Sequence, residues 1–91
     1  DIAGADNYAN GSQVKLYNKV KKVVGDKMPI AHHECGTNPT VDELLDDGAK
    51  WVWFMTWHTE YITDHNNTNE LSALYNSDYA ITLDELPDFI K

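Results

Sequence analysis

Strand-like and helix-like stretches alternate along this chain, and their order limits the fold more than any other feature. Three stretches are expected to be strands: residues 1–5, 29–35 and 50–57. Between them, residues 13–24 have the apolar spacing of an amphipathic helix, and Thr40 with Glu43 forms the T-x-x-E capping box of a shorter one. Strands that alternate with helices of this size run parallel and are joined by crossover helices, so the sequence predicts an α/β fold.

The length of the chain limits how such a sheet can be completed. Three strands cannot close a barrel, and an open parallel sheet needs helices on both faces and protected edges. With 91 residues, and a first residue that is Asp1 rather than Met, the chain is expected to be an excised or mature part of a larger unit.

The charge of the chain disfavours several kinds of partner. Seven Lys or Arg residues against fifteen Asp or Glu residues give a net charge of −8. Binding to DNA or RNA requires cations that neutralise phosphates, so nucleic acid is not an expected partner. Anionic membrane surfaces are disfavoured for the same reason, and no apolar run reaches the roughly 20 residues that span a bilayer. Cys35 is the single cysteine, which excludes an intrachain disulfide.

The ends of the expected elements are marked by specific residues. Ser12 is a candidate N-cap for the helix over residues 13–24, and Gly25 is a candidate for its end. After the third strand, residues 58–68 are expected to form a long polar loop that could bind a ligand. Asn69 is then expected to cap a helix that ends near Ser77. Thr82 begins a second T-x-x-E box.

The third strand is the most hydrophobic stretch, KWVWFMTW over residues 50–57. A near-continuous apolar run of this length predicts a strand buried on both faces. Strict alternation would place Trp51, Trp53, Met55 and Trp57 on one face. Trp51 and Trp53 are expected in the core. Trp57 ends the strand, where it could stack on a sugar ring or simply pack against the protein.

Glu34 is the leading candidate for chemistry because it lies at the C-terminal end of a buried strand, PIAHHECG, before the break at Gly36. Catalytic groups of α/β folds gather beyond such strand ends, where a carboxylate can act as nucleophile or acid/base. Tyr8 could hold this carboxylate if it follows the neighbouring strand, and Asp6 would lie on the same side as Tyr8. The plainer alternatives are a structural carboxylate and a surface tyrosine.

Other patterns point less clearly to a site. His32, His33, Glu34 and Cys35 resemble a metal cluster, but adjacent strand residues should point to opposite faces, so no metal is expected. Cys35 could be a nucleophile with His58 or His65 as base, although a buried thiol is the better expectation. Asn10 and Asn66 each begin a glycosylation sequon, a pattern that often arises by chance.

Four motifs in order resemble the C-terminal part of glycoside hydrolase family 26, the β-mannanases with a (β/α)₈ barrel. They are D-x-Y at Asp6 and Tyr8, the PIAHHECG strand, WFMTW ending at Trp57, and YAITLDELP over residues 79–87. The resemblance covers essentially the whole chain. It implies an α/β fold in which residues 1–91 form the last three βα units, strands six to eight, of one TIM barrel.

The resemblance also implies roles for single residues. Glu34 matches the catalytic nucleophile, Tyr8 the tyrosine that bonds it, Asp6 a polar active-site residue and Trp57 the aromatic side chain that stacks on the sugar. A retaining glycosidase needs two carboxylates about 5 to 5.5 Å apart. The family's acid/base glutamate lies on strand four, upstream of this chain, so the chain alone is expected to be inactive.

The implied protein is a retaining endo-β-1,4-mannanase, secreted or at the cell surface, that hydrolyses mannan, galactomannan or glucomannan without a cofactor. Its expected partner is the N-terminal part of the same barrel. Two alternatives stay open at this point. One is a non-catalytic carbohydrate-binding module, and the other is a barrel glycosidase for another β-glycan, such as β-1,3-xylan or mixed-linkage glucan.

Overall fold

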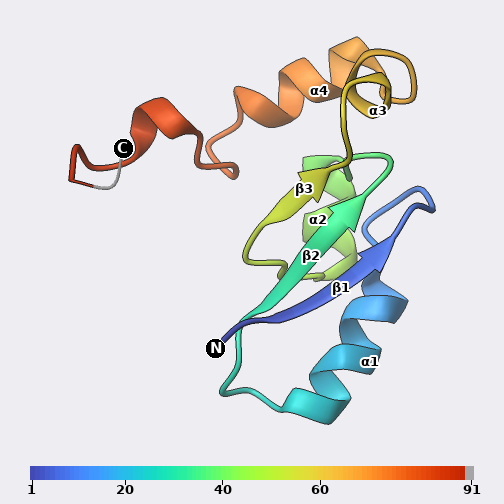
Figure 1. Cartoon of the computed structure of the whole chain (residues 1–91), viewed down its shortest axis with the longest axis vertical. Helices are drawn as coiled ribbons and strands as arrows, with labels where there is room; N and C mark the ends of the chain where they lie inside the picture. The colour runs from blue at the N-terminus through green and yellow to red at the C-terminus, as the bar shows by residue number, and fades with distance from the viewer. Residues whose placement is uncertain (90–91) are drawn as a thin grey trace.

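A computed structural model describes residues 1–89 of the chain, so the predicted unit of residues 1–91 extends two residues beyond the described part. Its centre is a parallel sheet with the strand order β1-β2-β3. The strands are β1 (Ala3–Asn7), β2 (Ile30–Cys35) and β3 (Phe54–Thr56). Figure 1 shows the three arrows pointing the same way, with helices α1 and α2 together behind the sheet. The predicted α/β architecture is confirmed.

Helix α1 (Val14–Val24) forms where the apolar spacing predicts it, but its start differs from the prediction. Ser12 does not cap the helix, because its side chain is buried and its hydroxyl donates to Asp47 instead. Gln13 takes the capping position in a left-handed conformation (φ 55°), and its side chain makes no capping bond. Gly25 ends the helix as expected, with a positive φ and an N–H that donates to Lys21.

Helix α2 (Val41–Asp47) confirms the predicted capping box. The Thr40 hydroxyl accepts from the Glu43 N–H at 3.2 Å, and the Glu43 carboxylate accepts from the Thr40 N–H at 2.9 Å. Gly48 then ends the helix with a left-handed φ of 71°, a conformation that glycine adopts without steric cost. Both ends of this short helix are therefore set by local sequence.

The core lies between the helices and the sheet. Its buried apolar members are Tyr17, Ile30, Leu44, Ala49 and Trp51. The Trp51 ring meets the Tyr17 ring edge-on, with centroids 5.1 Å apart, and its indole N–H donates to the Ser12 carbonyl at 2.7 Å. This bond satisfies the one polar atom that burial of the indole would otherwise leave without a partner.

The third strand is shorter and less buried than its sequence predicts. Only Phe54–Thr56 forms β3, because the chain bends at Val52 and the strict alternation from Trp51 is lost. Trp51 is 7% exposed, as expected for the core, but Trp53 is 39% exposed and its ring lies against His33. The prediction that both rings share one buried face is therefore wrong.

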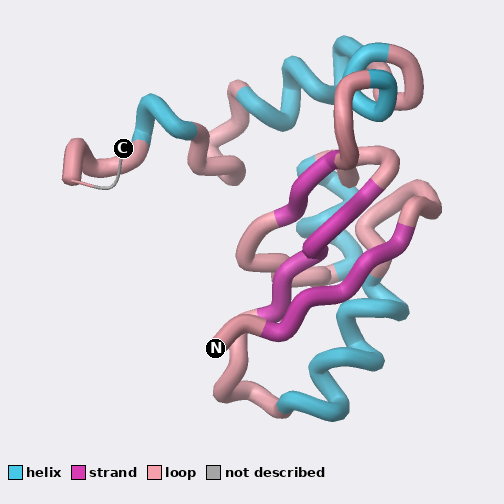
Figure 2. The backbone as a smooth tube through the Cα atoms, viewed as in Figure 1, coloured by secondary structure: helices cyan, strands magenta, loops and turns pink. Residues whose placement is uncertain are grey.

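The segment after β3 contains more helix than expected. The predicted loop over residues 58–68 includes α3 (Glu60–Thr63), and α4 (Thr68–Tyr75) begins inside it. The cap of α4 is Asn67 rather than Asn69, since the Asn67 side chain accepts from the N–H groups of Asn69 and Glu70. The second T-x-x-E box is present at Thr82, before the 3₁₀ turn η1 (Leu83–Glu85). Figure 2 shows this segment extending away from the sheet.

None of the helices in the described part of the chain combines the length and the apolar character needed to cross a bilayer.

Candidate active site

The candidate residues from the sequence gather where the parallel strands end. Asp6 belongs to β1 and Glu34 to β2, and the two are register partners. Tyr8 follows β1 directly and Trp57 follows β3, so all four positions lie along the carboxyl edge of the sheet, the edge nearest to α3 in Figure 1. In parallel α/β sheets this edge is where ligands usually bind.

Tyr8 and Glu34 are joined by a short hydrogen bond. The Tyr8 hydroxyl donates to Glu34 Oε2 at 2.6 Å, a distance typical of a bond between a hydroxyl and a charged carboxylate. The bond to Glu34 is the main reason that the pKa of Tyr8 is raised to about 12. The phenol therefore stays protonated at neutral pH and acts as a donor. One carboxylate oxygen of Glu34 is fixed, and this bond leaves Oε1 for another partner.

A β-bulge brings a further residue, His33, into the site. In the β1–β2 register Ala5 pairs with His32, but Asp6 pairs with Glu34, so His33 is skipped. Its Nδ1 lies 3.2 Å from Oδ1 of Asp6, an ion pair when the ring is protonated. Gly4 permits this position, because a Cβ there would come 3.1 Å from His33 Cβ. Bulges commonly redirect side chains near active sites, but no sequence pattern marks this one.

The bulge also corrects the expectation that adjacent residues of this strand could not share an ion. One ligand atom from each of Asp6, His33 and Glu34 lies within 4.8 Å of the other two, because the skipped residue turns His33 toward the side of Glu34. Exposed carboxylates often lie this close without a metal. Here Asp6 is bonded to His33 and Glu34 to Tyr8, so we assign no metal to the cluster.

Two residues that sequence reasoning missed hold the ring of Tyr8. A Cβ at Gly36 would come 3.1 Å from Cδ1 of Tyr8, so the ring lies directly against the glycine backbone. On another side, the Tyr61 ring of α3 meets the Tyr8 ring with centroids 5.4 Å apart. The sequence marks Gly36 only as a break after the strand, and nothing in it links Tyr61 to Tyr8.

Trp57 is anchored at the same edge through its backbone. Its N–H donates to the Cys35 carbonyl at 2.9 Å, while its indole is 39% exposed and meets the His58 ring edge-on at 5.4 Å. Since Thr56 is the register partner of Cys35, strand alternation puts Trp57 on the same face as Glu34. An exposed indole in this position can stack on a flat apolar ligand such as a sugar ring.

Cys35 is not placed for nucleophilic chemistry. The residue is fully buried, its thiol lies 3.5 Å from Oδ1 of Asn38, and burial raises its pKa. A thiol in such surroundings resists ionisation and is not accessible to a substrate. The expectation of a buried thiol is confirmed.

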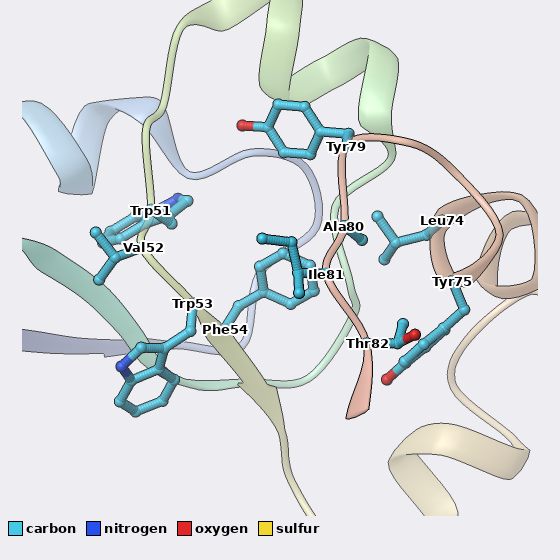
Figure 3. Close-up of a pocket in the computed structure, with 10 residues that line it drawn as sticks. All are labelled: Trp51, Val52, Trp53, Phe54, Leu74, Tyr75, Tyr79, Ala80, Ile81 and Thr82. Carbon is cyan, nitrogen blue, oxygen red and sulfur yellow. The ribbon is translucent and has the colours of Figure 1, made fainter. Parts of the chain in front are cut away.

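A hollow of about 250 Å³ lies elsewhere, between the start of β3 and the segment after α4 (Figure 3). Its lining includes the aromatic residues Trp51, Trp53, Phe54, Tyr75 and Tyr79, and it includes none of Asp6, Tyr8, Glu34 or Trp57. The lining residues include no carboxylate or histidine, so the hollow lacks the side chains that most often act as general acid or base, and it has no pair of carboxylates for glycoside hydrolysis.

Comparison with known sequences gives the family of the chain. The sequence model of glycosyl hydrolase family 26 matches residues 1–85. The mannan endo-1,4-beta-mannosidase of Thermothelomyces thermophilus is 39% identical over 90 residues, which cover 94% of this chain and 19% of that protein. Mannan endo-1,4-beta-mannosidase A of Piromyces sp. is 32% identical over 93 residues, which cover 98% of this chain and 15% of that protein.

Solved structures agree with the sequence match. A GH26-CBM35 beta-(1,4)-mannanase of Podospora anserina has a TM-score of 0.88 and 33% identity, over 100% of this chain and 21% of the other. A beta-mannanase from a symbiotic protist of the termite Reticulitermes speratus, in complex with gluco-manno-oligosaccharide, has a TM-score of 0.83 and 28% identity, over 96% and 28%. The chain thus spans less than a third of the length of each of these relatives. It belongs to glycosyl hydrolase family 26 and folds as a portion of the family's (β/α)₈ barrel.

Proposed function

We propose that this chain supplies the nucleophile of a retaining endo-β-1,4-mannanase, with Glu34 as the nucleophile and Tyr8 as the residue that holds it. The observation that carries the proposal is the 2.6 Å hydrogen bond from Tyr8 to Glu34 at the carboxyl edge of the sheet. A phenol with a pKa of about 12 keeps its proton at neutral pH, so Tyr8 orients the carboxylate as a hydrogen-bond donor and takes no part in proton transfer. Oε1 of Glu34 is the oxygen that attacks.

The reaction proceeds by two displacements. Oε1 of Glu34 bonds to the anomeric carbon while the glycosidic C–O bond breaks, and the leaving oxygen takes a proton from an acid carboxyl group. Water, deprotonated by the same group, then attacks the anomeric carbon and releases Glu34. The acid/base group comes from the remaining part of the barrel, since neither Glu60 nor Asp64 carries a motif for this role.

The substrate is a mannan-type polysaccharide: mannan, galactomannan or glucomannan. Trp57 stacks on the sugar next to the scissile bond, and Asp6, fixed by His33, bonds to sugar hydroxyls. The names of the related mannosidases and the gluco-manno-oligosaccharide bound to one structural neighbour support this choice. Because such polymers do not cross membranes, the enzyme acts outside the cell, either secreted or on the cell surface.

The test is the release of reducing sugar from galactomannan by the full-length chain that carries this segment. Replacing the nucleophile should lower kcat roughly 10⁴-fold or more, so Glu34→Ala should be almost inactive. A 2-deoxy-2-fluoromannosyl fluoride should label Glu34, as detected by mass spectrometry of peptides. Glu70→Ala is the matched control, because Glu70 is an exposed glutamate in the first turn of α4.

Other outcomes would separate the alternatives. If the full-length chain and its Glu34→Ala variant both bind galactomannan but release no sugar, the protein is a carbohydrate-binding module. This result would contradict the proposal. Higher kcat/KM on β-1,3-xylan or mixed-linkage glucan than on the mannans would keep the nucleophile and change the substrate. Undiminished hydrolysis by Glu34→Ala would place the nucleophile elsewhere.

A further inference from the structure

Asn66 joins two segments that both contact Tyr8, the residue that bonds to the candidate nucleophile Glu34. Its Oδ1 accepts from the backbone N–H of Asn38 at 2.8 Å, and its Nδ2 donates to the Gly36 carbonyl at 3.0 Å and to the Tyr61 carbonyl. Gly36 and Asn38 belong to the loop after β2, whereas Tyr61 belongs to α3, after β3. A single half-buried side chain therefore ties the end of β2 to α3.

The two segments tied by Asn66 are the ones that contact the Tyr8 ring. The Gly36 backbone lies against Cδ1 of Tyr8, and the Tyr61 ring lies 5.4 Å away at an interplanar angle of 60°. The hydroxyl of the same ring makes the 2.6 Å bond to Glu34. A shift of either segment would move the Tyr8 ring and lengthen that bond.

We infer that Asn66 is a positioning residue that keeps the Tyr8 hydroxyl in bonding distance of Glu34. The inference rests on the proposed function, because it assigns Asn66 a role in the reaction that Glu34 carries out. Asn66 does not touch the carboxylate; it acts through Gly36, Tyr61 and the Tyr8 ring. A displacement of a catalytic group by about 1 Å can lower the rate about 100-fold, so a smaller displacement is enough for a smaller loss.

A structural role alone would have a different effect from this positioning role. A side chain that merely stabilises the loop would lower the melting temperature and leave the turnover of the folded enzyme unchanged. A positioning residue lowers kcat of the folded enzyme. Because Tyr8 acts on the nucleophile and not on sugar binding, KM should change little.

The experiment is a double-mutant cycle in the full-length chain, with kcat and KM measured on galactomannan. We expect Asn66→Ala to lower kcat about tenfold with KM within about twofold. Tyr8→Phe removes the hydroxyl itself, so adding Asn66→Ala to Tyr8→Phe should cause no further loss beyond about twofold. Asn66→Asp is the second variant, since it keeps the shape of the side chain and loses both donated hydrogen bonds. It should show the same coupling to Tyr8 if Asn66→Ala does not fold.

Asn67→Ala is the matched control. Asn67 is the neighbouring asparagine, and its side chain caps α4 through the N–H groups of Asn69 and Glu70. Its loss should lower the melting temperature and leave kcat unchanged. Equal losses of kcat in Asn67→Ala and Asn66→Ala would overturn the inference.

The remaining outcomes also separate the inference from the proposed function. A normal kcat in Asn66→Ala, a higher KM alone, or a loss that persists undiminished in the Tyr8→Phe background would overturn the positioning role. After any of these results, Glu34 would still be assigned as the nucleophile if Glu34→Ala is inactive. Activity that survives Glu34→Ala would instead remove the proposed function.

Discussion

His32 and His33 are neighbours in β2 but lie in opposite surroundings. His33 is exposed beside Asp6, whereas His32 is 1% exposed and stacks on Trp51 with ring centroids 4.8 Å apart. Its Nε2 lies 3.2 Å from the Asn7 carbonyl, and its Nδ1 has no hydrogen-bond partner among the described residues. Burial lowers the pKa of His32, an effect that the Asn7 carbonyl and the Asp6 carboxylate offset only in part. The ring is therefore neutral in the folded chain at neutral pH.

We expect His32 to make stability depend on pH on the acid side of neutrality. In the unfolded chain a histidine binds a proton below about pH 6.5, but folded His32 binds one only at lower pH. The free energy of unfolding should therefore decrease as pH falls from about 6.5 through the folded pKa, by at most about 1.4 kcal/mol per pH unit. Denaturant unfolding of the full-length chain at several pH values measures this slope.

The control for His32 is a histidine that stays exposed. Glutamine cannot bind a proton in this range, so the free energy of unfolding of His32→Gln should vary less with pH. This free energy should also be lower than that of the unchanged chain. His65→Gln should keep the slope, because His65 is exposed in the folded chain. An unchanged slope in His32→Gln would assign the acid sensitivity to other groups.

At the scale of elements, α2 allows a direct test of its cap. Thr40→Ala removes the hydroxyl that accepts from the Glu43 N–H, and we expect a loss of about 1 kcal/mol in the free energy of unfolding. Turnover should not change, because α2 lies behind the sheet and contributes no residue to the candidate site. Denaturant midpoints and kcat measure the two effects.

Thr59→Ala is the matched control for the cap of α2. Thr59 holds the same capping position at the start of α3, but its side chain makes no capping hydrogen bond. Its replacement should change the free energy of unfolding by less than about 0.5 kcal/mol. Equal losses in the two variants would show that the hydroxyl bond of Thr40 does not stabilise the protein.

The elements that the sequence predicts well are those with local signals. The apolar spacing of α1 and the capping box of α2 depend on residues three or four positions apart, and both are confirmed. The ends of β3 depend on the partner strand and on the bend at Val52, so a hydrophobic run alone overestimates the strand. The start of α1 differs because Ser12 bonds to Asp47, a residue far along the chain.

The same contrast between local signals and contacts across the fold applies to the residues of the candidate site. Glu34 and Tyr8 could be proposed from the strand end and the family motifs, and the structure places them in contact. His33 depends on a register skip between β1 and β2. Tyr61 and Asn66 depend on how the segment after β3 folds back on the loop after β2. No spacing within the sequence reveals such contacts.

At the scale of the whole molecule, the described chain leaves much apolar surface uncovered. Within residues 1–89, no strand pairs with the outer edge of β1 or of β3. Ile81, Leu83 and Phe89 are 70% to 88% exposed, and Trp53 and Met55 are 39% and 43% exposed near the sheet. Unpaired strand edges and exposed apolar side chains favour association with other chains.

We therefore expect the isolated 91-residue chain to self-associate and to be inactive. Its average mass in sedimentation velocity should rise with concentration, because the uncovered edges and apolar side chains pair between copies. It should release no reducing sugar from galactomannan, since a retaining glycosidase needs a second carboxylate about 5 to 5.5 Å from Glu34. The full-length chain should be active under the same conditions. A monomeric 91-residue chain with cooperative unfolding would contradict the association, and hydrolysis by it would mean that a carboxylate within these residues serves as the acid.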